Sequence, residues 1–306
     1  MSETKVPPAP RNTDAESVGG AERTQLQMIM SRFLRHRAAM VSLVALVIIV
    51  LGAFLGPLLW KWDHTVNLEI PASVPPNAEH PLGTTTAGHD VLGQLMRGAQ
   101  QTLKVAFTVS VMGTVFGSLW GATAGYYGGR VDSLMMRVVD IFMIVPLLVM
   151  VAAIAGNSRG GTTWYAVALI IGFFSWAQIA RVVRGVVLSL REQEFVEAAR
   201  AAGASPSWII LRHLLPNAAG PIIVAATLLI AVAILLEAGM SFLQFGIQPP
   251  DISLGQMIGN ARTAASTRPW LFYPPGLLLL AICLTINFIG DGLRDALDPR
   301  QTMVRR

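Results

Sequence analysis

The chain has 306 residues and a formal net charge of +5, with 53% of its residues hydrophobic and only 13% charged. Because soluble domains carry about 25% charged residues, this composition excludes both an ordinary soluble enzyme and a disordered chain. The single cysteine, Cys283, excludes an internal disulfide and any cysteine-based zinc site.

The chain begins with a polar segment, residues 1–37, in which proline and glycine interrupt any regular pattern, and we expect it to be a disordered cytoplasmic tail. Six runs without a charged residue follow, each of at least 18 residues. Because about 20 apolar residues in a helix cross a hydrocarbon core of about 30 Å, each run is long enough to span a membrane. The predicted spans are 38–60, 105–127, 141–158, 161–180, 216–236 and 270–290.

The segments between and after these spans set the predicted topology. We expect residues 61–100 to form an extracytoplasmic loop, residues 181–213 a cytoplasmic loop and residues 295–306 a cytoplasmic tail, with residues 101–294 as the core of the membrane domain. This arrangement puts 17 of the 23 Lys and Arg residues on the cytoplasmic side, as the positive-inside rule requires. The topology accounts for the positive net charge, and we expect no nucleic-acid partner.

Two features of the spans predict how the helices pack. Gly113, Gly117, Gly121 and Gly125 recur every four residues in the second span, so they share one helix face where another helix approaches closely. Pro146 lies within the third span, and we expect it to kink or to start a helix there.

The sequence lacks the motifs of an ATPase, a hydrolase or a metal site within the membrane. None of the three lysines lies in the glycine-rich pattern of a P-loop, and all five histidines lie outside the predicted spans, which excludes a histidine-based metal site or hydrolase in the bilayer. Asp140, Glu237 and Asp291 lie at predicted span ends and are interpreted as boundary residues rather than as an ion relay. A transporter without a relay and without its own ATPase takes its energy from another chain.

The loop 181–213 carries the most specific pattern. Residues 191–202 are dense in strong helix formers, and Gly203 follows where a helix ends with a residue at positive φ. Ser205 is then a good N-cap, with Pro206 in the first helical position. The sequence predicts a slim helix–glycine–helix elbow that fits a groove on another protein, although a connector lying on the membrane surface has the same pattern.

The spacing within this loop resembles a family signature. Glu197-Ala198-Ala199, three residues, Gly203, nine residues and then His213-Leu214-Leu215-Pro216 resembles the "EAA" signature of permease subunits in binding-protein-dependent ABC importers. The family signature ends Ile-x-Leu-Pro, and here His213 replaces the isoleucine.

Further stretches are similar to the second-permease type of the dipeptide and oligopeptide branch of that family. These stretches are His80-Pro-Leu-Gly83-Thr84, Gly88-His89-Asp90-Val-Leu92, Gly125-Tyr-Tyr-Gly-Gly129, Gln248-Pro249-Pro250 and Gly290 to Arg300. Two positions depart from the branch, since Thr85 stands where Asp is usual and His89 where Arg is usual. The resemblance covers roughly residues 30 to 302.

The resemblance implies an all-α integral membrane protein with six transmembrane helices and the type I ABC importer permease fold. It implies a subunit that translocates dipeptides or oligopeptides across the bacterial cytoplasmic membrane, with both termini cytoplasmic. The implied partners are a homologous permease, two ATP-binding subunits or one fused subunit, an extracytoplasmic substrate-binding protein and the lipid bilayer. ATP and Mg²⁺ are expected on the partners, with no cofactor and no metal in this chain.

The resemblance also assigns roles along the elbow. The residues expected to couple the chain to the ATPase are Glu197, Ala198, Ala199, Gly203, Leu215 and Pro216. Gly203 makes the turn, and Glu197 either caps or pairs locally or meets a basic group on the partner. No catalytic residue is expected, and the sequence marks no substrate pocket. The same machinery for another solute, such as a nickel chelate or glutathione, remains open, as does a membrane scaffold without transport activity.

Overall fold

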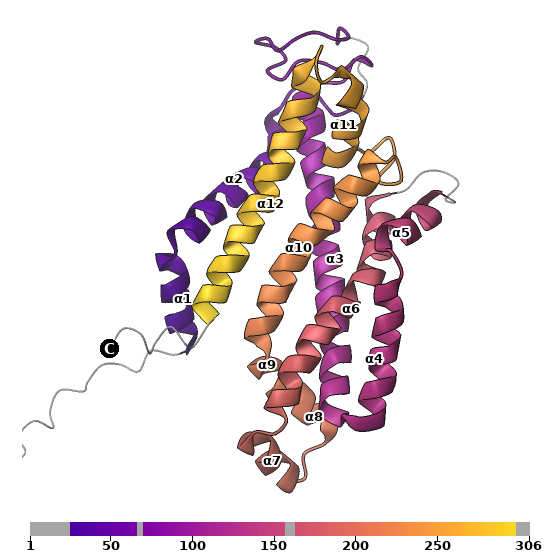
Figure 1. Cartoon of the computed structure of the whole chain (residues 1–306). Helices are drawn as coiled ribbons and strands as arrows, with labels where there is room; N and C mark the ends of the chain where they lie inside the picture. Colours follow the sequence, from indigo (N-terminus) through magenta and orange to yellow (C-terminus); the bar gives the residue numbers. More distant parts are fainter. Residues whose placement is uncertain (1–24, 66–69, 157–162, 298–306) are drawn as a thin grey trace, which may run out of the picture.

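A computed structural model describes residues 25–65, 70–156 and 163–297 as a bundle of long helices (Figure 1). The only β-structure among these residues is one antiparallel bridge, between Thr84 and Asp90. The helices before the elbow are α1 (Gln25–Arg35), α2 (Arg37–Leu59), α3 (Val91–Tyr127), α4 (Gly129–Ile144), α5 (Leu147–Gly156) and α6 (Trp164–Leu190). The later helices are α7 (Glu194–Ala201), α8 (Pro206–Ile209), η1 (Ile210–Leu214), α9 (Leu215–Asn217), α10 (Ala219–Phe242), α11 (Leu254–Ala261), η2 (Arg262–Ala264) and α12 (Pro269–Leu297).

The helix α3 lies in the middle of the bundle, with α6 along one side and α10 along another (Figure 1). The predicted glycine face of the second span is the surface that meets α6. A Cβ atom on Gly117 would lie 2.6 Å from the backbone oxygen of Trp176, and one on Gly121 would overlap the backbone oxygen of Ala180. Small residues therefore let the two backbones approach, and the predicted packing role of these glycines is confirmed.

Five of the described helices are long and apolar enough to cross a membrane, namely α2, α3, α6, α10 and α12. The third predicted span, 141–158, instead falls on the end of α4 and on α5. Val145 has an extended backbone (φ −74°, ψ 124°) because Pro146 disfavours a helical conformation in the residue before it. The expected helix break at Pro146 is confirmed. Residues 157–162, where the next turn is expected, lie outside the described residues.

The segment that the sequence places in a disordered tail is ordered from Gln25 onward. Residues 25–35 form α1, in which Phe33 is buried, while Met30 and Leu34 are exposed. The side chain of Phe33 packs in a small core with Ala39 of α2 and Ala296 of α12. The expectation of disorder is wrong for this part, because apolar side chains of α1 pack against the next helix, α2, and against the distant helix α12. Residues 1–24 and 298–306 lie outside the described residues.

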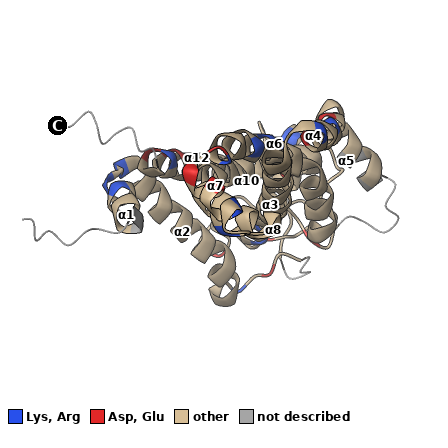
Figure 2. Ribbon diagram, turned by 90° about the horizontal axis from the view of Figure 1, so that it is seen from below, with Lys and Arg blue, Asp and Glu red and all other residues tan. Residues whose placement is uncertain are grey.

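The bundle has two distinct ends. The elbow end carries α7, α8, η1 and α9, and the loop end carries residues 70–90 and α11 (Figure 1). Seen from the elbow end, Lys and Arg lie on α1, α4 and α6 and around α7 and α8 (Figure 2). The guanidinium of Arg184 on α6 donates to both carboxylate oxygens of Asp132 on α4, at 2.5 and 2.6 Å, and so joins these two helices.

Candidate functional site

The elbow turns at Gly203, where the backbone has φ +80°. The Gly203 N–H donates to the carbonyl of Arg200 (2.9 Å), and the Ala204 N–H donates to the carbonyl of Ala199 (3.0 Å). These two hydrogen bonds form a Schellman motif, which satisfies the last carbonyls of α7 and needs a residue with positive φ at its centre. The predicted turn at Gly203 is confirmed.

The second arm of the elbow begins as the sequence predicts. The Ser205 hydroxyl accepts a hydrogen bond from the Trp208 N–H (3.4 Å), and Pro206 occupies the first turn of α8. Because Pro206 lacks an N–H, it removes one donor that the start of a helix leaves without a partner.

The inner face of the elbow packs firmly on the bundle. Its buried residues form one apolar cluster with side chains of α6 and α10. Val196 of α7, Ile209 of α8 and Leu214 of η1 are fully buried in this cluster, against Val183 and Val187 of α6. A displacement of the elbow therefore moves α6 and α10 with it, because packed side chains of this kind transmit a shift rather than absorb it.

Two arginines attach the elbow to the end of α3. The Arg191 guanidinium donates to the backbone carbonyl of Gly125 (3.1 Å). The guanidinium of Arg200 lies 5.1 Å from the ring centroid of Tyr126, which is a cation–π distance. Through these contacts the elbow is attached to α3 as well as to α6 and α10.

The residues singled out by the sequence divide into an inner and an outer set. Ala199 and Leu215 face the apolar cluster. The exposed members are Glu197, Ala198, Gly203 and Pro216. No described residue pairs with the carboxylate of Glu197, which excludes a local cap or ion pair within the described part of the chain. The outer set thus presents one acidic group and a narrow, small-residue surface.

The histidine that departs from the signature lies between two exposed aromatic residues. The ring centroid of His213 is 4.7 Å from that of Trp208 and 6.0 Å from that of Phe195. Trp208 is 48% exposed and Leu211 beside it is 57% exposed. Sequence reasoning missed this aromatic surface, although two aromatic residues in a polar loop were a signal that could have found it.

A wide helical turn links the elbow to α10. Between Ile210 and Leu214 the backbone forms a π-helix, in which the Leu215 N–H bonds back to the carbonyl of Ile210. Pro216 follows in α9, and its missing N–H interrupts the helical hydrogen bonds between η1 and α10. The Leu-Leu-Pro part of the signature therefore sets the angle between the elbow and a long helix.

At the opposite end, the motif around Asp90 stabilises the start of α3. Asp90 is fully buried and caps α3, accepting from the Gly93 N–H (2.7 Å) and from the Trp60 indole N–H (3.0 Å). Its second oxygen lies 2.8 Å from Nδ1 of His80, which is 3% exposed. The buried carboxylate is satisfied by three donors, as burial of a charge requires.

Thr85 and His89, the two residues of this loop that depart from the branch pattern, contact each other. The Thr85 hydroxyl accepts a hydrogen bond from the His89 N–H (3.0 Å) and lies 3.1 Å from Nδ1 of the His89 ring. The Thr85 hydroxyl thus contacts both the backbone and the ring of His89, and it leaves Nε2 of the ring without a partner among the described residues. Partial burial, and then the nearby His64, lower the pKa of His89 below its ordinary value, so the ring is neutral at pH 7.

A buried carboxyl group ties α10 to α3. Glu237 is fully buried and accepts hydrogen bonds from the hydroxyls of Thr102 (2.9 Å) and Ser241 (2.6 Å). From the sequence, Glu237 is interpreted only as a boundary residue, because its partner Thr102 lies 135 positions away in the chain. Among the described residues, no group of three or more His, Cys, Asp and Glu side chains could hold a metal ion.

Comparison with known proteins gives two matching sequence families. Residues 91–303 match the family described as binding-protein-dependent transport system inner membrane component. Residues 24–76 match the N-terminal TM domain of oligopeptide transport permease C. The chain is 40% identical over 280 residues to the oligopeptide transport system permease protein OppC of Mycobacterium tuberculosis, covering 91% of this chain and 96% of that protein. It is 36% identical over 298 residues to the OppC of Bacillus subtilis, with 96% of each covered.

The fold is similar to that of a solved transporter. A chain of the MetNI methionine ABC transporter in an inward-facing conformation superposes with a TM-score of 0.55 at 24% identity, over 67% of this chain and 96% of that one. This likeness and the family match confirm the expected all-α permease fold of the type I importers. Of the six spans expected, five are long helices, and the other is the segment divided at Pro146.

Proposed function

This chain belongs to the family of binding-protein-dependent transport system inner membrane components, and we propose that it is the permease subunit of an ATP-driven importer of peptides. The peptide substrate is inferred from the names of its relatives, which are oligopeptide transport permeases. The chain has no P-loop, so ATP and Mg²⁺ bind to separate subunits, and this subunit contributes the membrane path without catalysing hydrolysis.

The observation that carries the proposal is the elbow. Its outer set of residues is exposed, and the Glu197 carboxylate has no partner among the described residues, while its inner face is packed on α6 and α10. An ATPase that grips Glu197, Ala198 and Gly203 moves those helices through Ala199 and Leu215, and Pro216 fixes the angle at which α10 follows. The exposed rings of Phe195 and Trp208 extend the docking surface, since aromatic anchors dominate most interfaces.

The proposed orientation places the elbow end and both termini in the cytoplasm of a bacterial cell, with the chain in the cytoplasmic membrane. The excess of basic residues on that side of the predicted topology supports it. At the loop end, residues 70–90 and α11 then face the extracytoplasmic side, where a substrate-binding protein docks. A homologous second permease completes the path, because one bundle of this size has little room to enclose a peptide.

Cysteine cross-linking tests the docking of the elbow. The single native cysteine, Cys283, is 7% exposed, so an introduced exposed thiol is the main reactive group. In the assembled importer, Ala201→Cys is expected to cross-link to an ATPase subunit, whereas Thr86→Cys, exposed at the loop end, is not. Cross-linking of both variants, or of neither, contradicts the proposed docking.

Uptake into proteoliposomes tests the substrate. The complete importer is expected to accumulate a labelled tripeptide only with ATP, and an excess of unlabelled peptide is expected to compete. Competition by a nickel chelate or by glutathione, without competition by peptides, would replace the proposed substrate with one of those solutes.

A further inference from the structure

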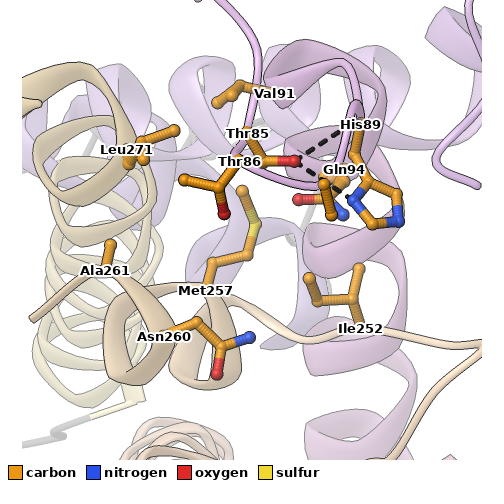
Figure 3. A pocket seen from close by; sticks show the side chains of 11 residues that line it. Thr85, Thr86, His89, Val91, Gln94, Ile252, Met257, Asn260, Ala261 and Leu271 are labelled. Carbon is orange, nitrogen blue, oxygen red and sulfur yellow. Dashed lines mark hydrogen bonds between the residues drawn. The ribbon is translucent and has the colours of Figure 1, made fainter. Parts of the chain in front are cut away.

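A cleft at the loop end lies between the segment Thr85–His89, the first turn of α3 and α11 (Figure 3). It has two adjoining chambers of about 190 and about 400 Å³, which share His89, Gln94, Ile252 and Asn260 as lining residues. Their combined size falls within the range of small-molecule pockets, roughly 300–1,000 Å³. We call the two chambers together the loop-end cleft.

Two glutamine amides line this cleft without partners. Gln94 of α3 is 8% exposed and Gln256 of α11 is 4% exposed, and neither side chain hydrogen-bonds to any described residue. The carbonyl oxygen of Gln256 is fully buried. Leaving that oxygen without a hydrogen bond costs about 1–3 kcal/mol. The other amide atoms of the two glutamines are not fully buried, so they can hydrogen-bond to a molecule in the cleft.

Other polar groups of the cleft are neutral. Thr85 contacts Nδ1 of His89, which leaves Nε2 of that ring free to donate or to accept a hydrogen bond according to its tautomer. The amide oxygen of Asn260 is already bonded to the Gln244 side chain (3.2 Å), which leaves the Asn260 amino group as a further donor. Asp251 at the second chamber is neutralised by Arg97, whose guanidinium lies 2.6 Å from the carboxylate. The cleft therefore offers amide-like donors and acceptors without a net charge.

The smaller chamber adds an apolar floor. Met257 extends from α11 toward Thr86, with Val91 above it and Leu271 to its left in this view (Figure 3). Val91 is fully buried, and Met257 and Leu271 are 6% and 9% exposed. An apolar recess beside the amides of Gln94 and Gln256 matches one residue of a peptide. The side chain of that residue would lie in the recess, and its neutral main chain would hydrogen-bond to the two amides.

We propose that the loop-end cleft is a subsite for substrate peptide, in which Gln94 and Gln256 hydrogen-bond to the peptide main chain and Met257 contacts a side chain. The inference rests on the proposed import of peptides. Recognition of the main chain accepts peptides of different sequence, because every residue carries the same N–H and C=O groups. The subsite lies within a single permease subunit, on the side from which substrate arrives.

The variants Gln94→Leu and Gln256→Leu remove the amides while keeping similar volume. The control is Gln101→Leu, because Gln101 is fully buried, both of its amide atoms lack partners among the described residues, and it lies outside the cleft. The probe is the tripeptide alanyl-photoleucyl-alanine, added to the complete importer in nanodiscs. Mass spectrometry locates the photo-cross-link, and the same probe is used in uptake measurements with proteoliposomes.

In the wild type we expect cross-links within residues 252–261. Each cleft variant is expected to weaken apparent probe affinity about three- to tenfold, the effect of one neutral hydrogen bond or two. Neither variant breaks a hydrogen bond of the described residues, so their unfolding temperatures are expected to equal or exceed that of the wild type. Gln101→Leu is expected to have the same effect on the unfolding temperature but to leave the probe affinity unchanged.

Cross-links that lie only outside the cleft, or unchanged probe affinity in both cleft variants, overturn the subsite. Weaker docking of the empty binding protein, with probe cross-linking unchanged, also overturns it and assigns the cleft to a loop of that partner. Failure of the wild type to take up any peptide is a different result, since it contradicts the proposed function while the position of the cross-link still decides the subsite.

Discussion

Replacing Gly203 with valine tests whether the shape of the elbow couples this chain to its ATPase. At φ +80° an L-residue is strained, and a β-branched residue is strained most. A Cβ atom at this position would meet nothing within 4 Å. The whole cost of the substitution therefore lies in the backbone, and the bundle around the elbow keeps its packing.

The left-handed conformation costs an L-residue roughly 1–2 kcal/mol relative to glycine. That energy corresponds to a factor of about 5–30 in the population of the native elbow. We expect Gly203→Val to insert into the membrane normally and to lose peptide uptake by about this factor, while ATP hydrolysis no longer rises with substrate. Gly203→Asn is the matched control, because asparagine tolerates positive φ and can hold the Schellman turn.

The assay measures uptake and ATP hydrolysis separately in proteoliposomes that hold the complete importer. The expected order of uptake per ATP is wild type, then Gly203→Asn close behind, then Gly203→Val. Normal uptake by Gly203→Val would refute the role of the elbow shape. Equal loss in both variants would show that the small size of glycine, rather than its backbone conformation, is what matters.

Three further predictions concern the bundle and the loop. Gly121→Ala is expected to destabilise the protein by about 1–3 kcal/mol, because its Cβ overlaps the α6 backbone. Gly185→Ala is the control and should not destabilise the protein, because its Cβ lies in open space. Thermal unfolding in detergent compares the two variants. Arg184→Ala leaves the buried Asp132 without its partner and is expected to lower the free energy of unfolding by about 3 kcal/mol. The double variant Arg184→Ala/Asp132→Ala should recover most of this loss in the same assay. The pKa of His89 is lower in the folded than in the unfolded chain, so the unfolded chain binds a proton first as the pH falls. The stability of the protein should therefore decrease below about pH 6.5. Unfolding temperatures that fall equally in the wild type and in His89→Gln would contradict this.

Local patterns of the sequence determined several parts of the structure. Long stretches without charge identified the spanning helices, because a charge at the centre of a membrane helix costs roughly 2.5–3.5 kcal/mol. Gly203 and Ser205 identified the elbow, since a positive φ and an N-cap each depend on one residue and its near neighbours. The glycines at every fourth position identified the packing face of α3, because residues at this spacing lie on one side of a helix.

Contacts between distant segments could not be read in this way. Phe33 of α1 finds Ala296 of α12, and nothing near Phe33 in the chain indicates that partner. The loop departures Thr85 and His89 looked like independent changes until the structure placed them in contact. The resemblance to the branch marked both positions, but only the structure showed that the two residues contact each other.

The sequence by itself determined that this chain is a membrane bundle with a glycine-hinged elbow, because hydropathy, glycine conformation and helix capping act over one or a few turns. Only the tertiary structure decided that Glu237 reaches Thr102 and that Gln94 and Gln256 meet at one cleft. The physical reason is that the hydrogen bonds of a buried polar group depend on which helices pack around it, and that packing is a property of the whole bundle.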